Sequence, residues 1–314
     1  MDTDAGRVSA PPRRTAFVLT GGGSLGAVQV GMVAALQDHG ITPDVLVGTS
    51  VGAVNAAHLA GPGPWPDRVG ELTELWLRLR RSDVFAVDPR RWLRAGTGSS
   101  PSLFSGAPLR RLLAGHLGYR ALEEAQRGLA VTATDVVTGA GPVLDRGPVV
   151  DAVAASAAVP GLLPPVAWRG RALVDGAVGH PAALDHADRR GVDDIYLLPA
   201  GYPCAGREPS GALAIALTAL TLLLHTRLVD EVDRYAGDAR LHVVPSLCPL
   251  AVSPADFTRA DELIERTRAH TSVWLRHDEV RDPEPSSTAG LALHGPHAPG
   301  RQPRPPRTAR RSVA

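Results

Sequence analysis

Lysine is absent from this sequence, so arginine carries every fixed positive side-chain charge. Aromatic residues are also scarce, at 4% of 314 residues, whereas 44% of the residues are hydrophobic. Alanine, valine and leucine must therefore fill most of the interior of one large domain or two small ones. Only two cysteines are present, Cys204 and Cys248, which excludes a disulfide framework and a zinc motif and is typical of a reducing compartment.

Long apolar segments are missing from the N-terminus and, with one exception, from the interior. Residues 1–12 carry charges and no apolar run, so we expect no secretory signal. The longest uncharged run, Ser210–Thr226, is short for a membrane span and is interrupted by Thr218, Thr221 and His225. We expect this run to form a buried or interfacial helix. The expected location is cytoplasmic, with peripheral contact at a membrane left open.

The net charge of +1 hides an uneven distribution of charge along the chain. Residues 281–314 contain six arginines and two acids, a charge of +4, which leaves the remainder of the chain at −3. A mildly acidic remainder offers no general basic face, so we expect no nucleic-acid partner. We predict a flexible tail over residues 1–13, one folded domain over 14–280 and a disordered Pro/Arg-rich tail over 281–314.

Strand and helix patterns alternate between the two predicted tails. Apolar runs predict strands over Ala16–Thr20, Val45–Val47, Leu129–Val137, Gly141–Leu144, Ala172–Val174, Ile195–Pro199 and Arg240–Val244. Helices are predicted over Ala27–Asp38, Val51–Ala60, Glu71–Arg81, Val149–Ala158, Ser210–Tyr235 and Ala255–Arg276, and a long loop over Asp83–Gly106. This alternation predicts an α/β fold with a mostly parallel central sheet that helices cover on both faces.

A G-x-S-x-G pattern places Ser50 between the second predicted strand and the second predicted helix. Gly48 and Gly52 permit a cramped turn from strand to helix and leave room beside the hydroxyl. The helix that begins at Val51 directs free backbone N–H groups and the positive end of its dipole toward the same corner. A serine hydroxyl is a poor nucleophile until it is exposed, aligned and relieved of its proton, and this combination predicts that Ser50 is such a nucleophile.

The glycine-rich segment after the first predicted strand has two interpretations. Gly21, Gly22 and Gly23 let successive N–H groups converge on one point, which predicts a concavity for an anion such as a tetrahedral oxyanion. The same segment, with Gly26, matches the G-x-G-x-x-G fingerprint of dinucleotide sites. That fingerprint expects an acid at the end of the second strand, where this chain has Gly48-Thr49-Ser50. We therefore favour the oxyanion interpretation.

Asp175 is the third candidate group. It follows the apolar pair Leu173-Val174 and precedes Gly176 and Ala177, so its carboxylate is expected at a strand end. A carboxylate beside a serine can accept the hydroxyl proton directly, without a histidine between them. The alternatives are an ordinary turn aspartate and a triad that uses His180 as its base, although a loop or cap position suits that histidine better. His225 and His242 have no partners at ligand spacing, so no metal site is predicted.

Together these segments resemble the patatin-like phospholipase family over roughly Arg14 to Arg276. The resemblance rests on four segments in order, namely the loop Gly21–Gly26, the elbow Gly48–Gly52, the segment Ala154–Pro160 and the D-G-[GA] element Asp175–Ala177. It implies a three-layer α/β/α sandwich that hydrolyses acyl esters of lipids, with Ser50 as nucleophile and Asp175 as base. It also implies that N–H groups of Gly22, Gly23 and Val51 hold the oxyanion, without a metal or organic cofactor.

Leu25 departs from the pattern of that family, whose members often carry Arg or Lys at this position. The departure removes a charge beside the glycine-rich loop. Ala177 is a smaller departure, because Gly-Gly is the commoner sequence after the aspartate. Two other functions stay open: a conventional esterase with a Ser-Asp-His triad, and a non-catalytic member of the fold that binds a lipid or a partner.

Two sets of apolar residues have open roles. The first is a leucine stripe at helical spacing, expected mostly in the core and alternatively in an acyl-chain pocket: Leu213, Leu217, Leu220, Leu224 and Leu228. The second is a set of aromatic residues within the irregular region 62–106: Trp65, Trp76, Phe85, Trp92 and Phe104. A lid or interfacial contact and aromatic packing in a small-residue core are equally consistent with this second set.

Overall fold

The computed structural model of the chain describes residues 13–202, 204, 209–276 and 291. Within them one eight-stranded sheet comprises β1 (Thr15–Leu19), β2 (Val45–Gly48), β3 (Gly128–Asp135), β4 (Val143–Leu144), β5 (Val166–Trp168), β6 (Arg171–Asp175), β7 (Asp194–Leu198) and β8 (Arg240–Val243). The order is β5-β6-β3-β2-β1-β7-β8, with β4 beside β3. From β3 to β8 the neighbours in this order run parallel, whereas β4, β5 and β6 pair antiparallel. The predicted mostly parallel sheet is confirmed.

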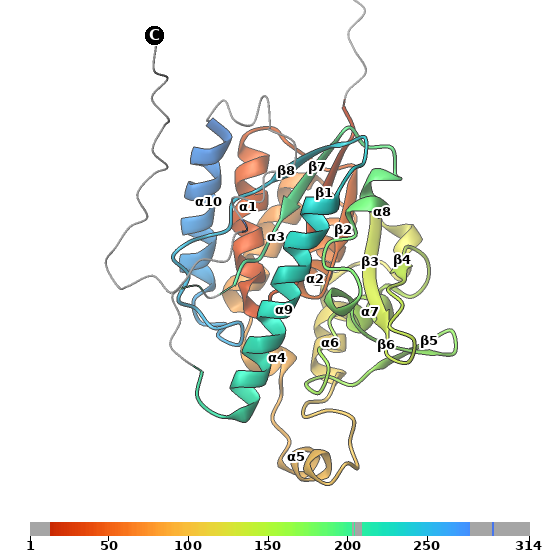
Figure 1. Cartoon of the computed structure of the whole chain (residues 1–314). Helices are drawn as coiled ribbons and strands as arrows, with labels where there is room; N and C mark the ends of the chain where they lie inside the picture. Colours follow the sequence, from red (N-terminus) through yellow and green to blue (C-terminus); the bar gives the residue numbers. More distant parts are fainter. Residues whose placement is uncertain (1–12, 203, 205–208, 277–290, 292–314) are drawn as a thin grey trace, which may run out of the picture.

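Helices cover both faces of this sheet (Figure 1). They are α1 (Gly26–Asp38), α2 (Val51–Leu59), α3 (Trp65–Arg78), α4 (Arg81–Val84), α5 (Pro89–Gly96), α6 (Ala107–His116), α7 (Val149–Ser156), α8 (Leu184–Asp188), α9 (Ala212–Arg234) and α10 (Ala260–Arg276). Phe17 and Leu19 of β1 belong to the core shared with α1, α2, α3, α7 and α10, and Ala16 and Val18 to the core shared with α8 and α9. Successive strand residues point to opposite faces, so the fold is a three-layer α/β/α sandwich, as predicted.

The central helix α1 explains how a chain with few aromatic residues packs its interior. Every residue from Gly26 to Leu36 is buried, because the helix lies between other elements on all sides, and it packs extensively on α10. A Cβ atom at Gly31 would lie 2.4 Å from the Ile264 carbonyl oxygen, so the glycine allows α10 to approach the α1 backbone. Small residues therefore supply close contact where large ones are missing.

The order of the strands places the candidate residues at one edge of the sheet. The chain passes from β1 to β2 and β3 on one side, and β7 and β8 then lie on the other side of β1. Parallel strands end at the same edge of the sheet, and a change of direction leaves a crevice there. The turns that follow β1 and β2, which contain the glycine-rich loop and Ser50, both lie at this edge.

Several elements differ from the sequence-based prediction. The predicted long loop over Asp83–Gly106 contains α4 and α5, and the helix predicted from Glu71 begins earlier, at Trp65, with a proline in its first turn. Asp88 caps α5, since its side chain accepts hydrogen bonds from the N–H groups of Arg90 and Arg91. The helices α6 and α8, the strand β5 and three 3₁₀ turns, Gly23–Leu25, Leu122–Glu124 and Gly176–Val178, were not predicted. The predicted tails lie outside the described residues, apart from Arg13 and Leu291.

The prediction for the leucine stripe on α9 is wrong for most of its length. Leu228 is buried, but Leu213 is 52% exposed and the other three stripe leucines are only partly buried. Among the described residues, α9 is also the one helix whose length and composition would allow it to cross a membrane, and only 11% of its most apolar window is buried. The helix touches the sheet with its C-terminal half, where Leu228 and Val232 pack against the strands.

Candidate active site

Ser50 lies at a strained turn between β2 and α2. Its backbone has φ +55° and ψ −123°, a conformation that a residue with a side chain rarely adopts. The glycines on either side are required by close packing: a Cβ atom at Gly48 would lie 2.5 Å from the Ala53 Cα atom, and one at Gly52 would lie 2.2 Å from the Leu19 carbonyl oxygen. The sequence therefore forms the sharp turn that presents a serine between a strand and a helix.

Asp175 meets Ser50 directly. The Ser50 hydroxyl donates a hydrogen bond of 2.6 Å to Oδ2 of Asp175, and the N–H of Ala177 donates one of 2.9 Å to Oδ1. Both side chains are buried, and no imidazole lies between them. Burial raises the pKa of Asp175 from 3.8 to about 6, against the opposing effect of the hydrogen bonds from Ser50 and Ala177. The carboxylate is therefore ionised, and able to accept a proton, only above about pH 6.

Neighbouring strands fix the position of Asp175. It ends β6 opposite Ala133 of β3, and its carbonyl oxygen accepts a hydrogen bond of 2.8 Å from the Thr134 hydroxyl. Its own N–H donates to the Ala158 carbonyl oxygen at 3.0 Å. Glycine is required at position 176, because a Cβ atom there would lie 2.0 Å from the Thr132 hydroxyl. The aspartate is thus held by its backbone on both sides, which leaves its carboxylate aimed at Ser50.

Ser156 is a supporting residue whose role the sequence did not reveal. It ends α7 and is fully buried, and its hydroxyl accepts a hydrogen bond of 2.9 Å from the N–H of Ser50. The segment Ala154–Pro160 was part of the family resemblance, but nothing in its local pattern distinguishes this hydroxyl. The bond satisfies the N–H at the strained residue and holds the turn in place.

The glycine-rich loop lies beside Ser50. A Cβ atom at Gly21 would lie 3.1 Å from the Ser50 Cβ and 3.8 Å from its hydroxyl oxygen, and Gly23 has a φ of +61°. A Cβ atom at Gly22 would lie 2.5 Å from the Ala200 side chain. Within the described residues, the N–H groups of these three glycines and of Val51 donate to no protein acceptor. Unoccupied donors beside a serine hydroxyl are the groups that stabilise an oxyanion.

A buried network of amide side chains holds both ends of this loop. The Gln29 side chain donates to the Thr20 carbonyl oxygen at 2.8 Å, immediately before the glycines. Asn55 donates to Gln29 Oε1 at 2.9 Å and to the Gly26 carbonyl oxygen at 3.1 Å, at the end of the loop. The indole N–H of Trp76 donates to Asn55 at 2.8 Å and completes the network. Polar residues within apolar helices were the only signal for this role in the sequence.

Packing or exposure explains the positions of the remaining candidate residues. Leu25 is fully buried in the core, so the position where the family often carries a basic residue faces the interior in this chain. Gly26 lets α1 approach α2, because a Cβ atom there would lie 2.5 Å from the Val51 side chain. His180 is exposed and follows the 3₁₀ turn after Asp175. Among the described residues, no group of three His, Cys, Asp or Glu side chains is placed to hold a metal ion.

Comparisons with known proteins identify related chains. The family model described as Patatin-like phospholipase matches residues 17–188. An uncharacterized NTE family protein of Mycobacterium tuberculosis is 32% identical over 291 residues, which cover 86% of this chain and 48% of that protein. The lysophospholipase nte1 of Aspergillus terreus is 28% identical over 189 residues, which cover 60% of this chain and 12% of that protein. This chain thus spans about half or less of the length of these relatives.

Solved structures give a more distant comparison. VipD from Legionella pneumophila is 16% identical, with a TM-score of 0.43 over 88% of this chain and 69% of that one. The type III effector protein ExoU is 17% identical, with a TM-score of 0.42 over 88% of this chain and 54% of that one. The family match over residues 17–188 contains Ser50, Asp175 and the glycine-rich loop.

Proposed function

We propose that this chain, which belongs to the patatin-like phospholipase family, is a serine acyl hydrolase that cleaves fatty-acyl ester bonds of lipids. The observation that carries the proposal is the buried hydrogen bond of 2.6 Å from the Ser50 hydroxyl to Asp175, beside a loop with unoccupied N–H donors. The family and the name of the fungal relative support a lipid ester as the substrate class. The proposed location is cytoplasmic, with transient contact at a membrane surface where the substrate lies.

The proposed first step forms an acyl-enzyme. Oγ of Ser50 attacks the ester carbonyl carbon while its proton passes to Oδ2 of Asp175, along the existing hydrogen bond. The carbonyl oxygen becomes an oxyanion that accepts hydrogen bonds from the N–H groups of Gly22, Gly23 and Val51. When the tetrahedral intermediate collapses, the C–O bond to the alcohol breaks and Asp175 returns the proton to the leaving oxygen.

The second step releases the fatty acid. Asp175 accepts a proton from a water molecule, which attacks the acyl carbon and re-forms the oxyanion. Collapse of that intermediate breaks the bond to Ser50 Oγ, which regains its proton from Asp175. Each backbone donor contributes because it is already oriented before the charge develops, and loss of one such donor costs about 3 kcal/mol in the transition state. The amide network of Gln29 and Asn55 supports this by fixing the loop.

Direct contact between Ser50 and Asp175 favours this dyad over a triad that contains a histidine. A fluorophosphonate probe tests the nucleophile: the wild type should be labelled, and Ser50→Ala should not. Absence of labelling in the wild type would contradict the proposal and favour a non-catalytic, lipid-binding member of the fold. Exposed Ser82 provides a matched control, because Ser82→Ala should leave labelling unchanged.

The role of Asp175 needs a separate test. Asp175→Asn should abolish hydrolysis of phospholipids, lysophospholipids and short p-nitrophenyl esters, whereas Asp185→Asn, an exposed position on α8, should not. Turnover retained by Asp175→Asn would refute the dyad and would favour a histidine as the base. The same substrate panel identifies the head group and chain length that the enzyme prefers.

A further inference from the structure

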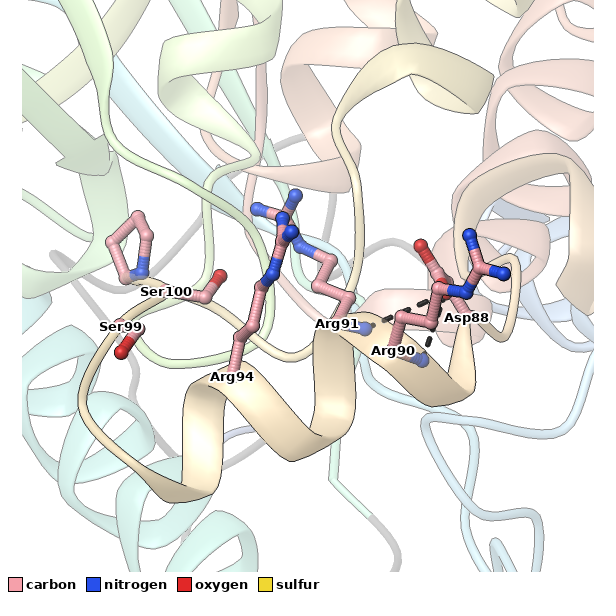
Figure 2. A pocket seen from close by; sticks show the side chains of 7 residues that line it. Asp88, Arg90, Arg91, Arg94, Ser99 and Ser100 are labelled. Carbon is pink, nitrogen blue, oxygen red and sulfur yellow. Dashed lines mark hydrogen bonds between the residues drawn. The ribbon is translucent and has the colours of Figure 1, made fainter.

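A hollow rich in arginine lies on α5 and the loop that follows it. Its volume is ≈ 440 Å³, and it is lined by Asp88, Arg90, Arg91, Arg94, Ser99, Ser100 and Pro101. The side chains of Arg91 and Arg94 extend to the same side of the helix, whereas Arg90 lies beside Asp88 (Figure 2). The hollow therefore presents two guanidinium groups together with serine hydroxyls.

These guanidinium groups are not neutralised. Within the described part of the chain, no carboxylate oxygen lies within 4.0 Å of a guanidinium nitrogen of Arg91 or Arg94. Arg91 donates one bond of 2.8 Å, to the Ser102 hydroxyl, and its buried Nε has no partner. The carboxylate of Asp88 is engaged as the cap of α5. Two neighbouring cations without an acid favour an anion, and guanidinium groups match the oxygens of a phosphate.

The opposite side of α5 is apolar and exposed. Leu93 is 74% exposed and Trp92 45%, and Val87 just before the helix is 58% exposed. The Trp92 and Phe104 rings pack edge to face at a centroid distance of 5.9 Å, and part of Trp92 stays exposed. Basic and apolar side chains on opposite sides of one short helix are typical of segments that lie at a membrane interface.

The N-terminal half of α9 provides a second apolar surface. The thirteen residues from Ala212 to Leu224 contain no charged side chain, and none of them is buried. Leu213, Ile215 and Leu223 are each more than half exposed. This half is ~20 Å long, too short to cross the hydrocarbon core of a bilayer, which is about 30 Å thick, so its exposed apolar side chains can only lie along one leaflet. The second half carries charged residues and packs on the sheet, so it stays with the protein.

Both surfaces lie at the end of the molecule that contains Ser50. The helix α9 connects the parallel strands β7 and β8, so its N-terminus is at the carboxyl edge of the sheet, where Ser50 follows β2. Figure 1 shows the start of α9 and the whole of α5 at this same end. The loop after α5 also contacts the segment before Asp175: the N–H of Phe104 donates to the Leu162 carbonyl oxygen, and Ala158, four residues earlier, accepts from the N–H of Asp175.

We propose that this end of the molecule docks on an anionic phospholipid surface, with the exposed apolar side chains of Ala212–Leu224 lying in one leaflet and Arg91 and Arg94 bound to headgroup phosphates. The inference rests on the lipid ester hydrolysis proposed above, because docking at this end brings the edge of the sheet that contains Ser50 close to a substrate in the leaflet. A backbone whose N–H and C=O groups are paired within a helix can enter hydrocarbon, whereas an exposed loop cannot. Arg91 and Arg94 then lie at the depth of the lipid phosphates, and each guanidinium group binds a phosphate.

Vesicle co-sedimentation with the full chain tests the role of the arginines. Vesicles of phosphatidylcholine with phosphatidylglycerol should bind the protein more tightly than phosphatidylcholine alone, and added salt should weaken the difference. Arg94→Ala should weaken binding to the anionic vesicles by about fivefold, the factor expected for one arginine near such a surface. Arg234→Ala is the control. It removes an equal charge from the C-terminal end of α9, away from the proposed docking surface, and should leave vesicle binding unchanged. Equal binding to both kinds of vesicle would overturn the phosphate contact, and addition of inorganic phosphate distinguishes a free anion site from a headgroup site.

The inserted helix needs its own variant. Leu223→Glu places a charge in the leaflet and should weaken vesicle binding by at least about tenfold. Val273→Glu is the matched control, because Val273 is 47% exposed near the C-terminal end of α10, away from the proposed docking surface. Unchanged binding of Leu223→Glu would refute the insertion. A different outcome would show that α9 contacts a second copy of the chain. In that case the wild type forms dimers and does not bind vesicles, and Leu223→Glu converts the dimers to monomers.

Failure of this inference and failure of the proposed function give different results. Vesicle binding needs no turnover, so Ser50→Ala should bind vesicles as tightly as the wild type does. A protein that reacts with the fluorophosphonate probe but never binds vesicles would refute the docking surface alone. A protein that binds vesicles without reacting with the probe would refute the hydrolase alone. Thermal unfolding of each variant separates lost binding from lost folding.

Discussion

The buried carboxylate of Asp175 leads to an unusual prediction, that removal of a proposed catalytic group stabilises the protein. Asp175→Asn replaces a group that ionises within the fold by a neutral amide of nearly the same shape. The amide oxygen can still accept the hydrogen bond from the Ala177 N–H, and the amide nitrogen faces the Ser50 hydroxyl. The variant therefore keeps most of the local contacts and loses only the buried charge.

The magnitude follows from the pKa of Asp175, which burial raises from 3.8 to about 6 in the folded protein. Between these two values the folded state binds more protons than the unfolded state, so the stability of the wild type falls as the pH rises through this range. The loss is complete above about pH 6. One pKa unit corresponds to 1.36 kcal/mol, so ionisation of Asp175 lowers the free energy of unfolding by about 3 kcal/mol. Asp175→Asn lacks this loss.

Urea unfolding of both proteins at a series of pH values measures the effect. The variant should be nearly as stable as the wild type at about pH 4 and about 3 kcal/mol more stable at about pH 8, because the other titrating groups are common to both proteins. Ser50→Ala gives an independent check, since it removes a hydrogen bond that stabilises the carboxylate and should enlarge the loss in the neutral range. A difference in stability that does not grow with pH, or a variant less stable at about pH 8, would show that the Asp175 carboxylate does not destabilise the fold when it ionises.

Two further predictions concern the proposed reaction. Because Asp175 must be ionised to accept the proton from Ser50, kcat/KM on a soluble ester should rise with pH and level off above about pH 6; a profile that is flat from about pH 5 to 7 would contradict this role. Ser156→Ala leaves the N–H of Ser50 without its acceptor, so urea unfolding should show a loss of about 1–3 kcal/mol and kinetics a fall in kcat with little change in KM. Wild-type kcat in the Ser156→Ala variant would show that the turn holds without this bond.

The positions of most strands and the two glycine-rich turns could be predicted because each has a local cause. Apolar runs followed by glycine and an alanine-rich helix produce the turns at Gly21–Gly26 and Gly48–Gly52, and both turns occur where they were expected. Asp175 is 125 residues from Ser50 in the sequence, and the family resemblance is what linked the two. The structure places their side chains in direct contact.

The supporting residues could not be predicted, because their roles depend on what packs around them. Gln29 and Asn55 are single amides within apolar helices, and nothing in the local pattern distinguishes a loop-binding amide from an exposed one. The leucines of α9 show the same limit. Helical spacing indicates which side chains share a face, but it does not indicate what covers that face, and for Leu213 the fold leaves it uncovered. Cys204 and Cys248, isolated in the sequence, have Sγ atoms 3.2 Å apart, and the local sequence gives no sign of this proximity.

The site combines groups that lower stability with neighbours that restore it. A positive φ at Ser50 costs about 1–3 kcal/mol, and the ionised carboxylate of Asp175 costs about as much again. The bonds from Ser156, Gln29 and Asn55 hold this unfavourable geometry, and each depends on a side chain that does not touch the proposed reacting atoms. Substitution of the buried carboxylate should therefore raise stability while it removes activity, whereas substitution of a supporting side chain should lower both. This opposite sign separates a catalytic role from a structural one in a single pair of measurements.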